Sequence, residues 1–331
     1  MSEIVKNRSE ILFLYDATDA NPNGDPVDEN KPRIDEETRV NIVTDVRLKR
    51  TVRDYLHDFK NCEILIREIE YGTGIQDAKI RAEDFLYQKK KSGEKEKVDK
   101  SKITLQQMVK TIQNNILEEC IDVRLFGVTL PVNKGPKEES SITYTGPVQF
   151  KFGRSLHQVD LTFIKGTGAF ASEAGAQQKT FREEYILPYS LIAFYGIVNE
   201  NAAKETLLKD NDIVLLLEGI WIGTRNLISR SKAGQVPRLL IQVIYKENQN
   251  FHIGELDRRI SKISNKDDKA IRSISDIKID ITNLVKTLNE HKDKIEKIRF
   301  KVDERIAFIK DGADISFETI LNNFSTEELS F

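Results

Sequence analysis

The N-terminal stretch reads as a buried strand, a turn-rich loop and a basic helix, and this unit limits the folds open to the chain. Ile11 to Tyr15 are consecutive large apolar residues, a run typical of a strand buried on both faces. The run leads into "NPNGDP" (21–26), a cluster of residues that favour turns. Such a cluster most often only reverses the chain, but exposed backbone amides there can also hold an anion. Both interpretations are open at this point.

An amphipathic helix follows the loop. Its apolar stripe consists of Leu48, Val52, Tyr55, Leu56 and Phe59. Thr44 or Asp45 stands where an N-cap is expected, and the other faces carry cations. Residues 39–53 contain five basic residues and one acid, a local charge of +4. The segment 62–71 then reads as a second strand.

The middle of the chain alternates apolar segments with polar insertions. We expect residues 72–120 to form a helical insertion around a mobile, lysine-rich loop. The Gly- and Ala-rich stretch 160–185 is expected to project as a long hairpin or loop. A capped apolar helix at 210–223 and a strand at 239–245 belong to a second unit. Its segment 224–246 has five basic residues and no acid.

Beyond residue 250 the hydrophobic pattern fits two structures. Apolar residues at heptad spacing within 270–302 would suit a coiled coil. The alternation in "DIKIDI" (276–281), a helical pattern after it and the alternating "RFKVDERI" instead favour strand, helix and strand. We favour the second interpretation.

Composition narrows the class of protein. Charged residues make up 31% of the 331 residues and hydrophobic ones 39%, as in globular proteins, and no run approaches membrane-spanning length. We therefore expect a cytosolic protein. Cys62 and Cys120 lie in apolar segments far apart, which favours reduced core cysteines, and the scattered histidines argue against zinc. We expect no metal and no cofactor. A net charge of −2 argues against a uniformly basic surface but leaves room for local patches.

The two basic segments favour phosphate binding over catalysis. Lys and Arg neutralise phosphates, and amides or hydroxyls in the adjoining turns fix the register. Either segment alone reads as a solvated face, whereas the pair favours one shared surface. The sequence contains no nucleophile elbow, P-loop lysine motif or pair of metal-binding histidines. Asp25 could assist attack on a phosphodiester, but an aspartate in a turn is more often a backbone cap.

Seven motifs occur in order between about residues 9 and 250. They are "YDATDANPNGDP", the R-x-D of Arg33 and Asp35, "VTDVRLKRTVRDYL", "LFG", "GPVQF", "LPYSLIAFYG" and "SRSKAGQVPRLLIQVIY". Together they resemble the CRISPR-associated backbone subunit of type I-B Cascade complexes. The combination of NPNGDP with VTDVRLKR is highly specific, although the related type I-C backbone subunit shares it.

The resemblance implies an α+β fold with an RRM-like (ferredoxin-like) palm, a helical fingers insertion and a thumb hairpin. The palm would comprise residues 9–71 and 186–331, of which 252–331 would be a C-terminal elaboration. The fingers would be 72–130 and the thumb 157–183.

The resemblance also implies a non-catalytic, RNA-binding subunit that forms a helical filament with other copies of itself along CRISPR RNA. Other Cascade subunits and a target DNA strand paired to the guide would be further partners. The RNA-binding residues would be Asn21, Asn23, Gly24, Asp25, Arg47, Lys49, Arg50, Arg53, Arg154, Ser155, Arg230, Ser231 and Lys232. Because the aromatic pair of a standard RRM is lacking, contacts should go mainly to phosphate and sugar.

A rival hypothesis makes the chain a ribonuclease. Backbone subunits of the related type III complexes cut target RNA with a loop aspartate, and Asp25 or Asp45 would be the candidate here. As a contrast to the binding surface, we expect Arg81 on the outer face of the insertion, where it would contribute little to RNA affinity.

Overall fold

The computed structural model describes residues 3–171 and 179–331, and the chain divides into two compact units. Unit 1 contains the N-terminal residues to 7 together with 52–149 and 198–219. Unit 2 contains 8–51, 150–197 and 220–331. Four elements contribute residues to both units: α1 (Asp45–Asp58), β11 (Val148–Phe150), β14 (Lys179–Val198) and α6 (Asp210–Arg225). The chain is an α+β protein, as expected.

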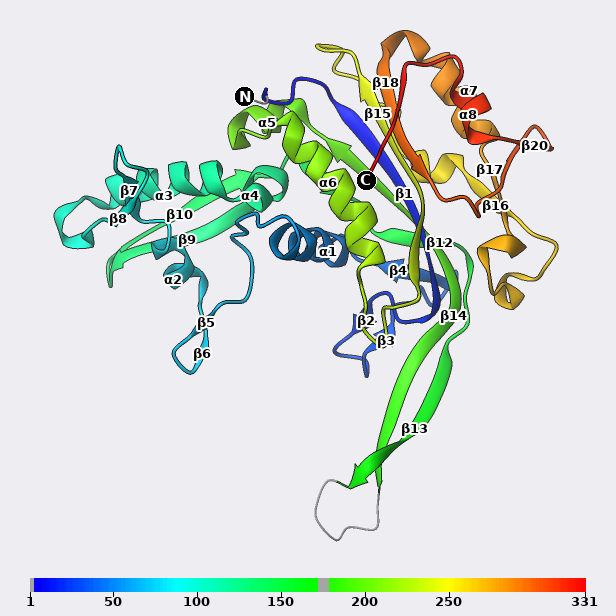
Figure 1. Ribbon diagram of the computed structural model, residues 1–331, viewed down its shortest axis with the longest axis horizontal. Coiled ribbons are helices and arrows are strands. Elements are labelled where there is room, and N and C mark those ends of the chain that lie inside the picture. The colour runs from blue at the N-terminus through cyan, green and yellow to red at the C-terminus, as the bar shows by residue number, and fades with distance from the viewer. Residues whose placement is uncertain (1–2, 172–178) are drawn as a thin grey trace. The chain divides into compact units, whose positions relative to one another are not determined.

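A mixed sheet forms the centre of unit 2 (Figure 1), with the strand order β21-β18-β15-β1-β14-β12-β4. Its strands are β1 (Ser9–Ala20), β4 (Val40–Val43), β12 (Gly153–Gln158), β14 (Lys179–Val198), β15 (Gln235–Tyr245), β18 (Ile295–Val302) and β21 (Thr326–Glu328). Strand β1 pairs antiparallel with β15, from Ser9 opposite Ile244 to Ala17 opposite Gln235. All residues from 9 to 17 are buried, so the strand predicted from the apolar run is confirmed.

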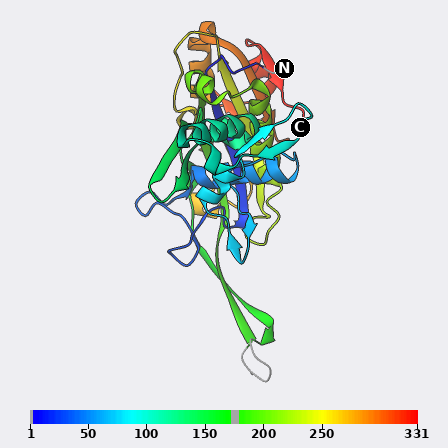
Figure 2. The ribbon, with the colours of Figure 1, turned by 90° about the vertical axis from the view of Figure 1, so that its left-hand side faces the viewer.

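Strand β14 is 20 residues long and serves two structures. Its second part lies in the sheet, while its first part pairs with β13 (Thr162–Ala171) as a hairpin that extends away from the sheet (Figures 1 and 2). The projecting hairpin expected for 160–185 is therefore confirmed where the structure describes it. Residues 172–178 of the expected thumb lie outside the described residues.

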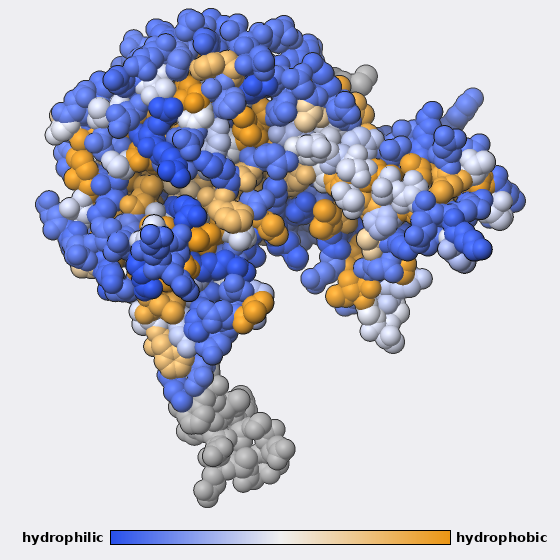
Figure 3. Space-filling view, turned by 180° about the vertical axis from the view of Figure 1, so that it is seen from behind, coloured by the Kyte–Doolittle hydropathy of each residue, from blue (hydrophilic) through white to orange (hydrophobic). Residues whose placement is uncertain are grey.

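The C-terminal part of unit 2 carries a smaller sheet of order β16-β17-β19-β20. Its elements are β16 (Ser261–Ile263), β17 (Lys278–Asp280), β19 (Phe308–Lys310), β20 (Ala313–Ile315) and the short helix α8 (Phe317–Leu321). Helix α7 (Thr282–Glu290) has nine residues and stands between β17 and β18 in the chain. The strand–helix–strand interpretation is confirmed and the coiled coil is wrong. Hydrophilic side chains dominate the face of unit 2 drawn in Figure 3.

Unit 1 is built around helix α3 (Leu105–Glu119). Its other elements are β5 (Glu70–Tyr71), β6 (Gly74–Ile75), α2 (Ala78–Glu83), β7 (Tyr87–Lys89), β8 (Lys95–Lys97), α4 (Ile121–Phe126), β9 (Gly127–Gly135), β10 (Glu138–Thr145) and α5 (Glu200–Thr206). Met108, Ile112 and Ile116 form the buried face of α3, and they pack in one cluster with residues of α4, β9 and β10. The lysine-rich segment expected to be a mobile loop is instead the β7–β8 hairpin, because Tyr87 at its base is buried.

The strand expected at 62–71 is wrong. The backbone nitrogens of Leu65 and Ile66 donate to the carboxylate of Asp122, at 2.8 and 3.1 Å, instead of to a neighbouring strand. Ile64 and Leu65 are both buried although they are consecutive, so the side chains do not alternate between two faces as in a half-buried strand. A buried side-chain acceptor replaces the strand partner that the pattern suggested.

Candidate nucleic-acid interface

Two loops that are far apart in sequence lie against each other in unit 2. One is the NPNGDP loop after β1, and the other spans 226–234, between α6 and β15. Thr18 N donates to Gly234 O at 3.0 Å, and Asn21 N donates to Ser231 O at 2.8 Å. A Cβ on Gly234 would lie 2.0 Å from the carbonyl oxygen of Thr18, so only glycine permits this approach. The structure thus brings the two predicted binding loops together.

The NPNGDP loop is held by its own polar side chains. Asn21 is buried and donates from Nδ2 to Asn30 O at 2.6 Å. Gly24 pairs with Pro32 in the short β2–β3 hairpin (Gly24–Asp25 and Lys31–Pro32), where a Cβ would lie 2.7 Å from Asn30 O. Asp25 accepts from Val27 N at 3.1 Å and pairs with Arg33 Nη1 at 2.6 Å. Its carboxylate therefore caps its own loop.

The same loop is fixed to the N-terminus of α1. Asn23 Oδ1 accepts from the backbone nitrogen and from the hydroxyl of Thr44, each at 2.9 Å. Thr44 Oγ1 in turn accepts from Arg47 N at 3.3 Å, so Thr44, one of the two N-cap candidates in the sequence, caps the helix. A helix N-terminus presents partial positive charge. The loop and this end of the helix consequently form one surface within unit 2.

Lys232 holds the two loops together. Its ammonium donates to the carbonyl oxygen of Asn21 and, at 3.1 Å, to that of Pro22. Burial, and secondly the positive charge of Arg47, lower the pKa of Lys232 to about 8. Lys232 was expected to meet phosphate directly. The structure gives it first a positioning role, in which its charge lies at the base of the NPNGDP loop.

The exposed cations of this surface come from three different segments. Arg50 on α1 is exposed, and the side chain of Arg230 in the 226–234 loop is 61% exposed and paired with Glu184. The side chain of Arg154 on β12 is 49% exposed and lies 3.3 Å from Asp35. Hydrogen bonds from Thr38, with a smaller contribution from Arg154, lower the pKa of Asp35 to about 2. The cation of each pair is open to solvent, so we expect that a phosphate could take the place of either carboxylate.

Three residues that were expected to contact RNA instead make ion pairs or hydrogen bonds within the protein. Arg53 lies in unit 1, where its Nε pairs with Asp122 at 3.0 Å and its guanidinium lies over the ring of Phe126. Lys49 pairs with Asp45 at 3.0 Å, with only 13% of its side chain exposed. Ser155 is buried and links Asn41 N to His157 O. Charge and hydroxyl content were correctly read from the sequence, but the direction of these side chains was not.

Arg81 is another correction. It is buried in unit 1 and donates to the carbonyl oxygens of Ile64 and Leu65, at 2.8 and 3.1 Å, and to the carboxylates of Glu63 and Asp84. It is therefore a structural residue of unit 1 and does not lie on an outer face.

Sequence reasoning gave no role to a cavity of about 490 Å³ beside the NPNGDP loop. The side chains that line it include Lys31, Arg33, Arg39, Thr44, Phe152 and Leu161. Phe152, in the connection between β11 and β12, is 53% exposed, which is unusual for a large aromatic side chain. Three motifs of the sequence contribute to the lining of the cavity: NPNGDP through Asp25, the R-x-D motif through Arg33 and VTDVRLKR through Thr44.

Comparison with known proteins identifies the family. Residues 7–282 match the family described as CRISPR-associated protein Cas7. A CRISPR-associated protein Cas7 of Haloferax volcanii is 34% identical over 333 residues, covering 95% of this chain and 91% of that protein. The chain belongs to the Cas7 family. The resemblance found in the motifs is thus confirmed at the level of the family.

Two solved structures share the fold of this Cas7-family chain. One is a chain of a "CRISPR RNA-guided surveillance complex, pre-nicking", with a TM-score of 0.54, 13% identity and coverage of 98% of this chain and 96% of that one. The other belongs to a "CRISPR RNA-guided surveillance complex", with a TM-score of 0.51, 12% identity and coverage of 97% and 94%. Within the described residues, no helix has the length and apolarity needed to cross a membrane.

Proposed function

We propose that this chain is an RNA-binding subunit, several copies of which line up along CRISPR RNA as the backbone of a Cascade surveillance complex. The observation that carries the proposal is the junction of the NPNGDP loop, the N-terminus of α1 and the 226–234 loop, with exposed arginines around it. Membership in the Cas7 family supports it, as do the printed titles of the structures that share the fold. Other Cascade subunits and a target DNA strand paired to the guide are the further partners.

RNA contacts in this proposal go to phosphate and sugar. Arg50, Arg154 and Arg230 would meet phosphates directly, and Arg47 would add positive charge beside Lys232. Asn21, Asn23, Gly24, Asp25, Ser231 and Lys232 keep the loop in position. Because these contacts carry no base information, the subunit accepts any guide sequence. We leave Lys49, Arg53 and Ser155 out of the proposed contact set.

We infer that the chain does not cut RNA. The carboxylate of Asp25 pairs with Arg33 and accepts a hydrogen bond from Val27 N, and the carboxylate of Asp45 pairs with Lys49. Neither carboxylate is therefore free to act as a general base. Among residues 3–171 and 179–331, no three His, Cys, Asp or Glu side chains gather in a way that could hold a metal ion. Both observations favour a scaffold over the ribonuclease hypothesis.

The palm, fingers and thumb assignment is also a proposal. The order β15-β1-β14-β12, with α1 after β1 and α6 after β14 in the chain, supports an RRM-like palm, since it corresponds to strands 4-1-3-2 of a β-α-β-β-α-β unit. The β13–β14 hairpin would be the thumb at 157–183. Leu130, Val132 and Ile142 pack with α3, which favours extending the fingers from 72–130 to include the β9–β10 hairpin. The motif combination favours subtype I-B.

Native mass spectrometry with RNAs of increasing length tests the scaffold. We expect the number of bound copies to rise in steps with RNA length, and unrelated sequences of one length to bind alike. A single copy at every length would contradict the filament. Incubation of a target RNA with Mg²⁺ or Mn²⁺ tests the rival: metal-dependent cuts at regular spacing, abolished by Asp25→Ala, would replace the scaffold with a nuclease.

A further inference from the structure

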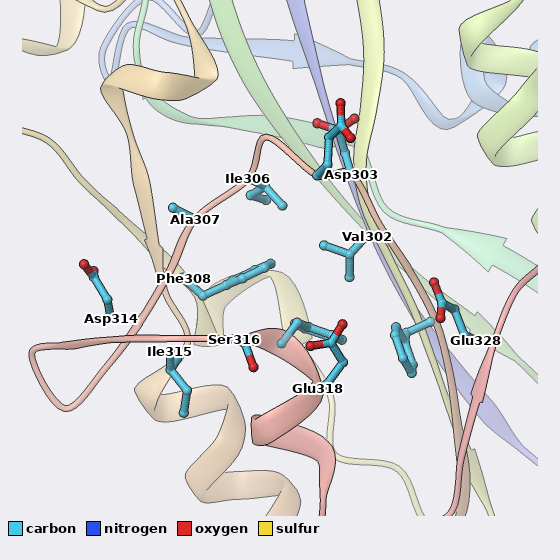
Figure 4. A pocket seen from close by; sticks show the side chains of 13 residues that line it. Val302, Asp303, Ile306, Ala307, Phe308, Asp314, Ile315, Ser316, Glu318 and Glu328 are labelled. Atoms are coloured by element: carbon cyan, nitrogen blue, oxygen red, sulfur yellow. The ribbon is translucent and has the colours of Figure 1, made fainter.

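A hollow of about 620 Å³ lies in the C-terminal part of unit 2, among β18, β19, β20, α8 and β21 (Figure 4). Figure 4 shows Phe308, Val302 and Glu318 pointing toward its middle, with Asp303 and Glu328 at its margin. None of the residues that line it belongs to the candidate nucleic-acid interface. The hollow therefore calls for an explanation other than guide binding.

The floor of the hollow is aromatic and aliphatic. Phe317 lies against Phe300 and Phe308, with ring centroids 5.3 and 5.1 Å apart. These three rings are largely buried in the core, while Val302 and Ile315 beside them are only partly covered. Such a floor can pack against the methylene stem of a long side chain.

The rim of the hollow is acidic. The titratable residues that line it are Asp303, Glu304, Asp314, Glu318 and Glu328, with no lysine or arginine among the lining residues. Two carboxylates are already paired, Asp303 with Arg238 and Asp314 with Lys278. In the described part of the chain, Glu304, Glu318 and Glu328 have no ion-pair partner, and all three are exposed.

The charge of this region excludes RNA as the occupant. Residues 303–331 carry seven acidic side chains and two basic ones, although the whole chain has a net charge of only −2. Phosphates would be repelled here, because like charges in a partly buried site are poorly screened. A metal ion does not suit the site either, since within the described residues these carboxylates spread around the rim without converging on a point.

We propose that the hollow receives a lysine or arginine side chain from a partner protein. The aliphatic stem would pack on Phe308 and Phe317, and the cationic head would meet Glu304 and Glu318 at the rim. An apolar floor beneath unpaired carboxylates matches the two halves of such a side chain. The hollow is thus a protein-docking site that is chemically distinct from the RNA surface.

Methyl NMR of the full-length protein with labelled isoleucines tests this proposal, because Ile306 and Ile315 line the hollow. The probe is a heptapeptide with a central arginine flanked by leucines, and the matched peptide carries citrulline, which has nearly the same shape but no charge. We expect both methyl signals to move with the arginine peptide, and to move much less with the citrulline peptide, at millimolar concentrations.

Charge-neutral variants complete the test. Glu304→Gln with Glu318→Gln should weaken the arginine peptide about fivefold, as two lost surface pairs imply. Glu247→Gln with Glu290→Gln, two exposed acids outside the hollow, should leave it unchanged. Four outcomes would each overturn the proposal. They are equal binding of both peptides, equal loss of affinity in both variants, methyl signals that do not shift when the arginine peptide is added, and displacement of the peptide by single-stranded RNA. Unchanged RNA affinity of the Glu304→Gln, Glu318→Gln protein keeps this result separate from the proposed RNA binding.

Discussion

Asn23 and Thr44 are joined by two hydrogen bonds to a single oxygen: Oδ1 of Asn23 accepts from both the nitrogen and the hydroxyl of Thr44, at 2.9 Å each. The NPNGDP loop and the first turn of α1 are therefore fixed to each other before any ligand arrives. A preorganised surface binds with a smaller loss of conformational freedom, so this pair should matter for both stability and affinity.

Replacement of Asn23 separates these two effects. Asn23→Ala removes the acceptor and leaves Thr44 without its partner, and should lower the free energy of unfolding by about 1–2 kcal/mol. Asn23→Asp keeps the acceptor and suits the helix N-terminus, so it should retain stability while its negative charge weakens RNA binding. Chemical denaturation and RNA titration measure the two quantities. Equal destabilisation by both substitutions would contradict the assigned hydrogen bonds.

Gly24→Ala should disturb the loop by crowding. Its Cβ would lie 2.7 Å from the backbone oxygen of Asn30, which cannot move as a side chain can. We expect a loss of about 1–3 kcal/mol in the free energy of unfolding, together with weaker RNA binding. Gly135→Ala is the matched control, since nothing lies within 4 Å of the added carbon. A control as damaging as Gly24→Ala would refute the steric explanation.

The salt dependence of RNA binding should identify the phosphate contacts. Each phosphate neutralised on single-stranded RNA contributes about −0.7 to the slope of log K against log salt. Arg50→Ala and Arg230→Ala should each flatten the slope by about that amount, equally for unrelated RNA sequences. Lys137→Ala, an exposed lysine of unit 1, serves as the control in place of the buried Arg81. A loss confined to certain bases would mean sequence readout.

Arg53→Ala should damage the fold more than RNA binding. The substitution leaves Asp122, which is fully buried, without its cation, and breaking such a pair costs about 3–5 kcal/mol. Arg154→Ala breaks an exposed pair and should cost less than about 1 kcal/mol. Thermal and denaturant unfolding compare the two variants. A flatter salt slope in Arg53→Ala protein that remains folded would return Arg53 to the contact set.

Lys232 should make RNA binding and stability respond to pH in opposite directions. Its pKa is lowered to about 8 from the usual 10.5 of lysine, by burial first and by Arg47 second. Above pH 8 the ammonium loses its proton, so RNA affinity should fall as the charge is lost. Between about pH 8 and 10.5, Lys232 is protonated in the unfolded chain and largely deprotonated in the folded one. The unfolded chain therefore binds more protons, so this residue makes the free energy of unfolding rise with pH. In Lys232→Met both trends should disappear; persistence of either would assign it to another group.

Local patterns predicted the elements whose partners are nearby in sequence. The stripe of Leu48, Val52, Tyr55 and Leu56 specified α1 because helical spacing alone brings these side chains to one face. The segment 62–71 failed because Asp122, distant in sequence, supplies the acceptor that fixes it. Contacts of that separation leave no local trace.

The candidate site shows the same limit. Residue types predicted a cationic surface, but they did not reveal which cations pair with acids inside the protein. Arg238 was counted in the basic segment 224–246, yet it is buried between Asp16 and Asp303. The contact between the NPNGDP and 226–234 loops depends on the antiparallel register of β1 with β15, which a single sequence does not reveal.

That register has a consequence for biosynthesis. Ser9 pairs with Ile244, so the apolar strand β1 leaves the ribosome long before β15 exists to cover it. At common translation rates of about 5–20 residues per second, the wait lasts about 10–50 s. During that time an unpaired hydrophobic strand is exposed in the nascent chain, a state prone to aggregation. The yield of assembled protein should therefore depend on chaperones that act on the nascent chain while it is still being made.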